Sequence, residues 1–440
     1  MYRAALVLRL AASQISAFTT LPNFTSSFVR NNVRLLSAPS DMQNQRDEIP
    51  TATTTHKRRE RYSGKYPRNF KHKYKEREGD EATISKVLAK GMTPAGQHVP
   101  IMVNECLQYM GLDDNQHQSN DPILVVDCTL GYGGHSSYIL KQIMNCTDAR
   151  LISFDQDSVE IKKTEERLRG SVLSELSSIT GRSYHIFTAV NQNFAKLGSY
   201  LKATNQLGKV TSLLADLGLS SMQIDDNERG FTYKRDAPLD MRMNQNDDTV
   251  KTAYHLLQQL RVRQLKSMLK NNSDEEFAAE IAQGLIGKGN KIPETTFELA
   301  DRVREIARPL LMQQNNWNNG QKLAKNQELK IKSQLDSTIA RVMQAIRIEV
   351  NGEFDVLDKL LDDVPKILSP GGRAVILTFH SGEDRRVKKA FKGGFKSGIY
   401  SEWSSDVVRP TSQERRDNPR SSCCKLRWAI RSEMRSADLE

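Results

Sequence analysis

The stretch LLADLGLSSMQIDDNERGFTYKRDAPLDMRM, which runs from Leu213 to Met243, decides the fold. Its short apolar run ends at Asp216, as expected for a buried strand of a parallel sheet. In open α/β sheets, ligands bind just outside the carboxyl ends of such strands. Beyond that end come hydroxyl, amide and many charged side chains, threaded with Phe231 and Pro238. A solvated loop is one interpretation of this composition, but a second stretch upstream favours a ligand site.

That second stretch begins with the apolar run Ile123–Asp127, which again ends in an acid. The turn Gly131-Tyr132-Gly133-Gly134-His135 follows, and then a helix is expected through about Met144. Glycines let a backbone approach a ligand closely, and the amino end of a helix is electropositive. The pattern is typical of a nucleotide-binding βα unit, although GxGG alone also fits a plain tight turn.

A third apolar run, Arg150–Asp157, places Asp155 at its end, 28 residues after Asp127. A carboxylate near this spacing binds the ribose in dinucleotide and adenosyl sites. The complete phosphate fingerprint GxGxxG is absent from the turn. We therefore expect an adenosine-bearing ligand without a pyrophosphate, for which S-adenosylmethionine is a better fit than NAD.

Two further strands complete the first part of the sheet. We predict one at Tyr184–Phe187, with Phe194 just beyond it, where an aromatic ring can pack on adenine or on the core. The other is Leu213–Asp216. Four successive β–α units predict an α/β fold with a doubly wound sheet.

From residue 249 to 347 the sequence shows helical periodicity and no strand pattern. This segment is too long for a crossover, so we predict an inserted all-helical domain. Gln313–Gln334 is rich in Asn, Gln and Lys and is predicted to be a loop. The expected helices are Thr252–Leu260, Glu275–Ile286, Phe297–Ala307 and Ile339–Val350.

After the insertion the sheet pattern resumes, which makes the sheet domain discontinuous, with parts 97–248 and 348–440. We expect a helix at Phe354–Leu368, a turn at Ser369–Gly372 and a strand at Arg373–Phe379 that leads into His380. Lys425–Arg431 is predicted to be a late strand.

The net charge of +11 is unevenly distributed along the chain. Residues 1–77 carry almost all of it, whereas residues 385–435 form a second basic region. Residues 1–40 are rich in Ala, Ser and Leu, contain Arg and lack acids, as in an organellar targeting peptide. We expect a mitochondrial address in the matrix, with a plastid leader as the alternative. Residues 41–96 are basic and polar, as in a disordered linker.

The five cysteines show no CxxC pair or Cys/His cluster with zinc spacing, so we expect reduced thiols and no metal. No apolar run approaches the ~20 residues that a membrane helix needs.

Five motifs, taken together and in this order, closely resemble one family, the MraW/RsmH-type small-subunit ribosomal RNA (cytosine-N(4))-methyltransferases. The resemblance extends from about His98 to Arg427 and closes with Asn418-Pro419-Arg420. The motifs are GYGGH at Gly131–His135, DLGLSSMQIDDNERGF at Asp216–Phe231, PLDMRM at Pro238–Met243, QAIRIEVN at Gln344–Asn351 and PGGRAVILTFHSGEDRRVK at Pro370–Lys388.

This resemblance implies a class I methyltransferase fold, a Rossmann-like doubly wound sheet with a helical insertion, and S-adenosylmethionine as methyl donor. With the leader, it implies an organellar member that acts on the small ribosomal subunit, as a monomer or a homodimer. The implied cofactor contacts are Gly133, Gly134, His135, Asp155, Phe194, Asp216 and Gln223.

The chain departs from the family pattern at three places. Met222 replaces a usual Pro, and Ser337-Thr338 replaces a usual His-Pro. Glu276, Ala279 and Glu280 occupy positions that are basic in the family, which removes positive charge from the insertion.

Methylation of an exocyclic amine needs a group that accepts the amine proton and a methyl group held in line. Asp216 is the first candidate for that acceptor, and His380 is the second. A histidine at a strand end is more often a structural hydrogen-bonding residue. For phosphate contacts we choose the cations Arg341, Arg347, Arg385, Arg386 and Lys388.

Three functions remain open from the sequence. The first is methylation of a cytosine in organellar small-subunit ribosomal RNA. The second is a ribosome-assembly factor that binds RNA without essential turnover, and the third is a methyltransferase that acts on another RNA or on DNA.

Overall fold

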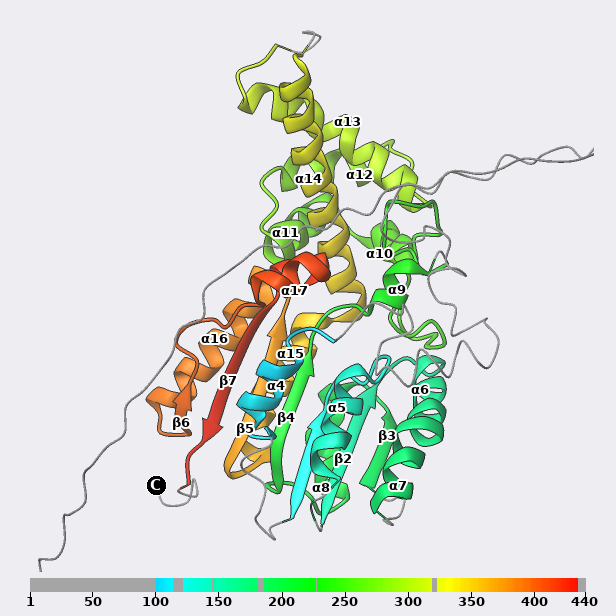
Figure 1. The fold of residues 1–440 in the computed structure, drawn as a ribbon. Coiled ribbons are helices and arrows are strands. Elements are labelled where there is room, and N and C mark those ends of the chain that lie inside the picture. The colour runs from blue at the N-terminus through cyan, green and yellow to red at the C-terminus, as the bar shows by residue number, and fades with distance from the viewer. Residues whose placement is uncertain are drawn as a thin grey trace, which may run out of the picture. The chain divides into compact units, whose positions relative to one another are not determined.

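The computed structural model describes residues 100–113, 122–144, 146, 148–180, 186–226, 228–318 and 323–433. The predicted targeting peptide and linker lie outside these residues. The described chain contains a seven-stranded sheet with the order β3-β2-β1-β4-β5-β7-β6 (Figure 1). Neighbouring strands from β3 to β5 pair in parallel, whereas β7 is antiparallel to β5 and β6. The predicted doubly wound α/β fold is therefore confirmed.

The strands are β1 (Ile123–Asp127), β2 (Ala149–Asp155), β3 (Phe187–Asn191), β4 (Val210–Asp216), β5 (Leu368–Thr378), β6 (Tyr400–Trp403) and β7 (Lys425–Arg431). Because β1 pairs with both β2 and β4, the strand order reverses there. Such a switch point leaves a crevice at the carboxyl ends of the strands. The late strand at β7 is confirmed, and β6 was not predicted.

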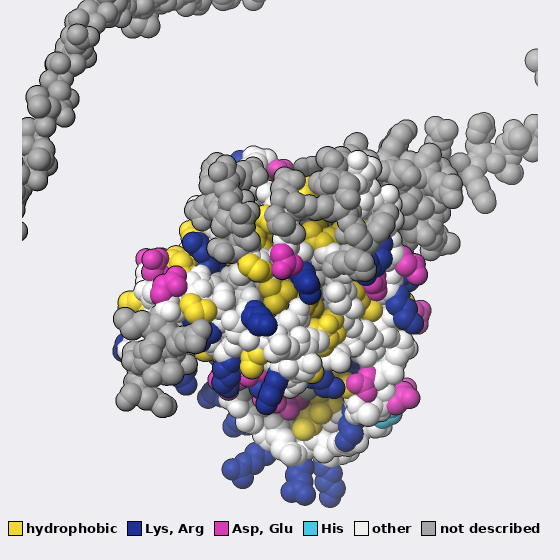
Figure 2. All heavy atoms as spheres, turned by 90° about the horizontal axis from the view of Figure 1, so that it is seen from below, with side chains coloured by type: hydrophobic (Ala, Val, Ile, Leu, Met, Phe, Trp, Pro, Cys, Tyr) yellow, Lys and Arg dark blue, Asp and Glu magenta, His cyan; other side chains and the backbone are white. Residues whose placement is uncertain are grey.

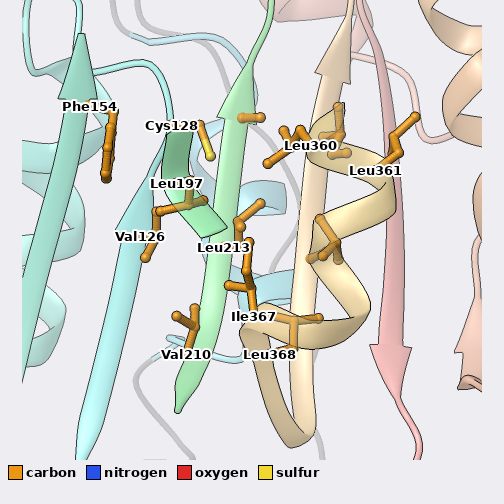
Figure 3. Packing of buried hydrophobic residues seen from close by; sticks show 14 of the residues in the cluster. Val126, Cys128, Phe154, Leu197, Val210, Leu213, Leu360, Leu361, Ile367 and Leu368 are labelled. Carbon is orange, nitrogen blue, oxygen red and sulfur yellow. The ribbon is translucent and has the colours of Figure 1, made fainter. Parts of the chain in front are cut away.

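Alternate residues of the buried strands pack on opposite faces of the sheet. Val125 and Leu214 belong to one cluster, which also contains residues of α4 (Val103–Met110), α5 (Gly134–Ile143) and α6 (Glu160–Leu168). Val126 and Leu213 face the other cluster, formed with α8 (Leu197–Ala203), α15 (Glu353–Ile367) and α16 (Ser381–Lys396). Figure 3 shows Leu213 beside Leu360 and Ile367 of α15 in this second cluster. Burial on both faces explains why these strands read as continuous apolar runs.

Of the described helices that lie in the sequence between β4 and β5, five share a third apolar cluster. Leu265, Ile281 and Val342 are fully buried within it. The helices are α10 (Ala253–Gln259), α11 (Val262–Ser273), α12 (Ala278–Ile286), α13 (Thr296–Gln314) and α14 (Lys325–Asn351). The predicted helical character of this segment is confirmed. Its limits at 249 and 347 remain predictions, and α14 continues beyond the second of them.

Short elements complete the described chain: the π-helix η1 (Arg169–Leu173), α7 (Ser174–Thr180), η3 (Phe194–Lys196), α9 (Ser221–Asp225), α17 (Ser412–Asp417) and η4 (Pro419–Cys423).

Three predicted elements differ in the structure. The loop predicted at Gln313–Gln334 is wrong over most of its length, because α14 begins at Lys325, where Ile331 is buried against α13. The third strand begins only at Phe187 and ends at Asn191. The turn predicted at Ser369–Gly372 lies within β5 as an irregularity of register opposite β4.

Figure 2 views the molecule from the end at which the parallel strands begin, and Lys and Arg side chains there are dispersed among apolar and acidic ones. Among the described helices, none has both the length and the apolar content required to span a bilayer.

Two adjacent glycines of α16 give a matched test of how this helix packs on β6. A Cβ at Gly394 would overlap the buried ring of Tyr400, whereas a Cβ at Gly393 would meet nothing within 4 Å. We expect Gly394→Ala to lower the free energy of unfolding by about 1–3 kcal/mol through overpacking. Gly393→Ala should raise it by up to ~1 kcal/mol through helix propensity. Urea denaturation of both variants measures this, and equal effects would contradict the packing described here.

Candidate active site

A cavity of about 610 Å³ opens at the carboxyl edge of the sheet. Ends of β1, β2, β3 and β4 contribute to its wall, together with residues of α14 and of the turn before β7. Eight of the residues singled out in the sequence line it: Gly134, His135, Asp155, Phe194, Asp216, Gln223, Arg347 and His380. The structure thus brings together residues that lie up to 246 positions apart in the chain.

The glycine turn after β1 forms one wall of the cavity. Gly131 has a φ of +48° and donates its N–H to Oδ2 of Asp155 at 2.7 Å. A Cβ at Gly134 would lie 2.5 Å from Cγ of Pro100, so a larger residue does not fit there. Gly133 has a φ of +72° and packs against Thr164 of α6. Gly133 is not among the residues that line the cavity, and its predicted contact with the cofactor stays a prediction.

Asp155 ends β2 and has both carboxylate oxygens engaged by backbone groups. Gly131 donates to Oδ2, and Asp157 donates its N–H to Oδ1 at 2.8 Å. Burial nevertheless raises the pKa of Asp155 to about 6, more than these hydrogen bonds lower it. Asp155 lies on the cavity wall as predicted, and its contact with a ribose stays a prediction.

Asp216 ends β4 and faces His135 of the glycine turn. Its Oδ2 lies 3.6 Å from Nδ1 of His135, whose Nε2 is 2.9 Å from the carbonyl oxygen of Ile101. Within the described chain, Oδ1 of Asp216 is buried without a hydrogen-bond partner. Burial raises the pKa of Asp216 to about 6. The charges of Asp127 and Glu383 raise this pKa further, whereas the charge of His135 lowers it. An unpaired acceptor with this pKa suits the uptake of a proton near neutrality.

Phe194 and Gln223 occupy two further positions on the cavity wall. Phe194 begins η3 and packs against the apolar cluster that contains Phe154. Gln223 closes a capping box at α9, in which its Oε1 accepts from the N–H of Ser220 at 3.0 Å. This box fixes the turn that contains Met222, the residue that departs from the family pattern.

His380 acts in the structure as the amino cap of α16. Its Nδ1 accepts from the N–H of Glu383 at 3.4 Å, and its Nε2 lies 3.2 Å from Oε1 of the same residue. The hydrogen bond and charge of His380, with the N–H of Phe379, outweigh burial and lower the pKa of Glu383. Nδ1 is thus engaged by Glu383, whereas Nε2 is buried without a hydrogen-bond partner among the described residues. Asp216 stays the first candidate for the proton acceptor and His380 the second.

Four of the five cations predicted to contact phosphate form ion pairs inside the described chain. Lys388 lies exposed on α16. Arg347 holds Glu353 with two hydrogen bonds of 2.7 and 2.9 Å on the cavity wall. The other pairs are Arg341–Glu275 at 2.7 Å, Arg385–Asp274 at 3.0 Å and Arg386–Asp358 at 3.4 Å. These residues therefore do not form one cluster of uncompensated charge.

Sequence reasoning did not anticipate what fixes the loop Leu213–Met243. Nη1 of Arg229 lies 2.7 Å from Oδ2 of Asp157, and Nη2 donates to the carbonyl of Met243. Both charged side chains are less than 10% exposed. A buried pair of this kind is strongly destabilising to break. The sequence feature that could have indicated this fixed loop is the arginine beside Gly230. Gly230 has a φ of +70°, a conformation that requires glycine.

The described residues include one trio with ligand spacing for a metal, Glu353, His380 and Glu383. Arg347 already holds the carboxylate of Glu353 there. Its positive charge opposes a metal cation at this place.

These residues fit an S-adenosyl cofactor. The carboxylates of Asp155 and Asp216 suit its positive charge, and Oδ1 of Asp216 lacks a partner among the described residues. The sheet order and the acidic strand ends define an S-adenosylmethionine-dependent methyltransferase with a Rossmann-like sheet and a helical insertion.

The chain belongs to the MraW methylase family, whose model matches residues 95–432. "Ribosomal RNA small subunit methyltransferase H 1" of Lachnoclostridium phytofermentans is 40% identical over 382 residues, which is 86% of this chain and 93% of that protein. The protein of the same name from Agathobacter rectalis is 40% identical and covers 86% of this chain and 98% of its own length. "Ribosomal RNA small subunit methyltransferase H 2" of Acholeplasma laidlawii is 38% identical, with coverages of 85% and 98%.

The pKa of Asp216 predicts how its replacement changes stability with pH. Because the folded pKa lies above the ordinary value of 3.8, the protonated form is favoured, and this contribution is lost as pH rises through about 6. Asp216→Asn should therefore be more stable than wild type at pH 7.5, by roughly 1–2 kcal/mol, since the side chain is 29% exposed. At pH 4 the difference should nearly vanish in chemical denaturation.

Asp240→Asn is the matched control from the same loop. Burial acts to raise the pKa of Asp240, but hydrogen bonds from Arg242 outweigh it and lower the pKa. This variant should therefore be less stable than wild type at pH 7.5, by about 1 kcal/mol. A change of the same sign in both variants would contradict the electrostatics described for Asp216.

Proposed function

We propose that this protein transfers a methyl group from S-adenosylmethionine to the exocyclic amine of a cytosine in small-subunit ribosomal RNA. The unpaired, buried Oδ1 of Asp216 on the wall of the cavity carries the proposal. The names of the relatives, which are small-subunit ribosomal RNA methyltransferases, support the substrate. When bound, the cofactor supplies an electrophilic methyl group on a sulfonium.

The chain's own residues then have three tasks. Asp155 and the glycine turn bind and orient the donor, and Phe194 packs beside its adenine. Asp216 accepts the proton that the amine loses as its nitrogen takes the methyl group. The raised pKa of Asp216, about 6, leaves it ionised at neutral pH and makes it a better base than an ordinary aspartate.

A cytosine has to leave its stack to enter a cavity at a sheet edge. Met343, Gln344 and Arg347 of α14 contribute to the wall away from the glycine turn. We assign the base to this side. Arg341, Arg347, Arg385, Arg386 and Lys388 remain our candidates for phosphate contacts, and the first four would have to exchange an acidic partner for a phosphate.

We place this reaction in the mitochondrial matrix, on the composition of residues 1–40. The test compares the location of the full chain with that of a chain that lacks residues 1–40, each fused at its carboxyl end to a fluorescent protein. Mitochondrial signal that is lost on deletion supports the proposal. Signal in plastids, or in the cytosol for both proteins, overturns it.

The rival function is a ribosome-assembly factor that binds RNA without essential turnover. Its support is the loss of positive charge at Glu276, Ala279 and Glu280 of the insertion. Glu275 and Asp274 also pair with predicted RNA-binding arginines. If the protein is an assembly factor, small subunits should bind it equally well when Asp216 is replaced.

Methyl transfer from labelled S-adenosylmethionine to small subunits that lack the modification separates the two functions. We expect label on a cytosine amine with the wild type and a 10²–10⁴-fold lower rate with Asp216→Asn. His380→Gln should lose far less, because His380 caps α16. Binding of the subunit without transfer by the wild type would favour the assembly factor.

The pH dependence of this rate is a separate prediction. Asp216 must be ionised to accept a proton, and its pKa is about 6. The single-turnover rate should therefore be near its plateau at pH 8 and about tenfold lower at pH 5. A rate that does not change between pH 8 and pH 5 would exclude Asp216 as the acceptor.

A further inference from the structure

The turn before β7 presents two polar atoms without partners to the same cavity. Among the described residues, Oδ1 of Asn418 and Nη1 of Arg420 are buried and make no hydrogen bond. Both residues line the cavity that contains Asp216. Buried polar atoms are nearly always satisfied, so atoms such as these indicate a ligand.

The topology explains why this turn lies beside Asp216. β5 pairs with β4 so that Leu377 is opposite Asp216, and β7 pairs with β5 so that Lys425 is opposite Thr378. Because β7 is antiparallel, its first residue lies at the edge where β4 and β5 end. The residues just before Lys425 therefore reach the carboxyl edge of the sheet.

The backbone around Asn418 is fully engaged although its side-chain oxygen is not. Its N–H donates to the carbonyl of Glu414 at 2.7 Å, and its own carbonyl accepts from the N–H and Oγ of Ser421 at 2.9 and 2.8 Å. The residue is 9% exposed. The backbone at Asn418 is thus held in place, while Oδ1 has no partner among the described residues.

Arg420 is oriented by an acid of the loop that follows β4. Its Nη2 lies 3.3 Å from both carboxylate oxygens of Asp225, at the end of α9. This pair connects the turn to the loop Leu213–Met243. It fixes one side of the guanidinium, and no described residue pairs with Nη1.

We infer that Asn418 and Arg420 recognise the hydrogen-bonding edge of the cytosine, with Oδ1 of Asn418 accepting one hydrogen of the reacting amine. The inference rests on the proposed function. The amine carries two hydrogens, and among the described residues the cavity wall offers two buried side-chain oxygens without partners, Oδ1 of Asp216 and Oδ1 of Asn418. Nη1 of Arg420 donates to a ring acceptor, the carbonyl oxygen or the ring nitrogen beside the amine.

This arrangement selects cytosine over uracil. Uracil has a carbonyl where cytosine has its amine, so two acceptors would face each other and both would remain unsatisfied. Sites that hydrogen-bond a substrate N–H reject an analogue without it far more strongly than apolar sites do. Asn418 is therefore a positioning and specificity residue, distinct from the proton acceptor.

The test uses the full chain with small subunits as methyl acceptor. Asn418→Leu removes the acceptor at similar volume, and Asn418→Asp keeps it. We expect Asn418→Leu to lower kcat about 10²-fold with unchanged S-adenosylmethionine affinity and Tm, and Asn418→Asp to restore at least tenfold of that loss. Arg420→Gln should lower the rate similarly, whereas Arg416→Gln, on the exposed side of α17, should not.

A second readout is independent of turnover. Saturation-transfer NMR compares cytidine 5′-monophosphate with uridine 5′-monophosphate on protein loaded with S-adenosylhomocysteine. The wild type should prefer the cytidine nucleotide, and both Asn418→Leu and Arg420→Gln should lose that preference.

The outcomes separate the inference from the proposed function. Two results overturn the inference alone, provided that the wild type methylates. One is a methylation rate of Asn418→Leu within threefold of the wild-type rate. The other is an equal loss of rate in Asn418→Leu and Asn418→Asp. No methylation, but a cytidine preference that depends on Asn418, overturns the proposed function and supports the inference. Neither methylation nor preference overturns both.

Discussion

Three carboxylates at the ends of three neighbouring parallel strands form the constraint on which the rest of the site depends. Asp127 ends β1, Asp155 ends β2 and Asp216 ends β4. Each has its pKa raised by burial, and the charge of Asp127 raises the pKa of the other two further. Such a group of acids is stable only if the surrounding chain donates hydrogen bonds to it.

The segment Thr129–Ser136, which contains the glycine turn, meets most of this requirement. Ser136 donates to Asp127 at 2.6 Å, and the N–H groups of Thr129 and Gly131 donate to Asp127 and Asp155. Among the described residues, none donates a hydrogen bond to the buried Oδ1 of Asp216. A cationic ligand compensates the remaining charge, so we expect binding of the methyl donor and stability of the fold to be linked. The site is built at a cost to the stability of the free protein.

Part of the arrangement of charged groups at the site was predictable from local sequence. An apolar run that ends in an acid identifies a strand end, and parallel strands place their ends at one edge, so Asp155 and Asp216 could be brought together without coordinates. The pairing of Arg347 with Glu353, or of Arg385 with Asp274, could not, because these acids are distant or unremarkable in sequence. A basic residue in a motif says nothing about the acid that folding places beside it.

The composition of one segment also predicted the wrong secondary structure, because tertiary packing decides the structure of that segment. Gln313–Gln334 looks like a loop because it is polar, yet Ile331 and Leu335 are enough to pack the first turns of α14 on α13. Helices gain most of their stability from one packed face, and two apolar residues at helical spacing supply it here. The sequence did not predict β6, because a four-residue edge strand carries almost no hydrophobic pattern.

The loop Leu213–Met243 is held from three distant parts of the chain, and this is why the site needs nearly all of it. Arg229 fixes the loop to Asp157 after β2, and Asn351 of α14 accepts from the N–H of Met243 at 2.8 Å. Arg420 fixes its α9 end from the turn before β7. Removing α14 would take away Asn351, and removing the turn before β7 would take away Arg420. A methyltransferase sheet alone could bind the donor, but the acceptor side of the cavity exists only when the insertion and the carboxyl-terminal turn meet this loop.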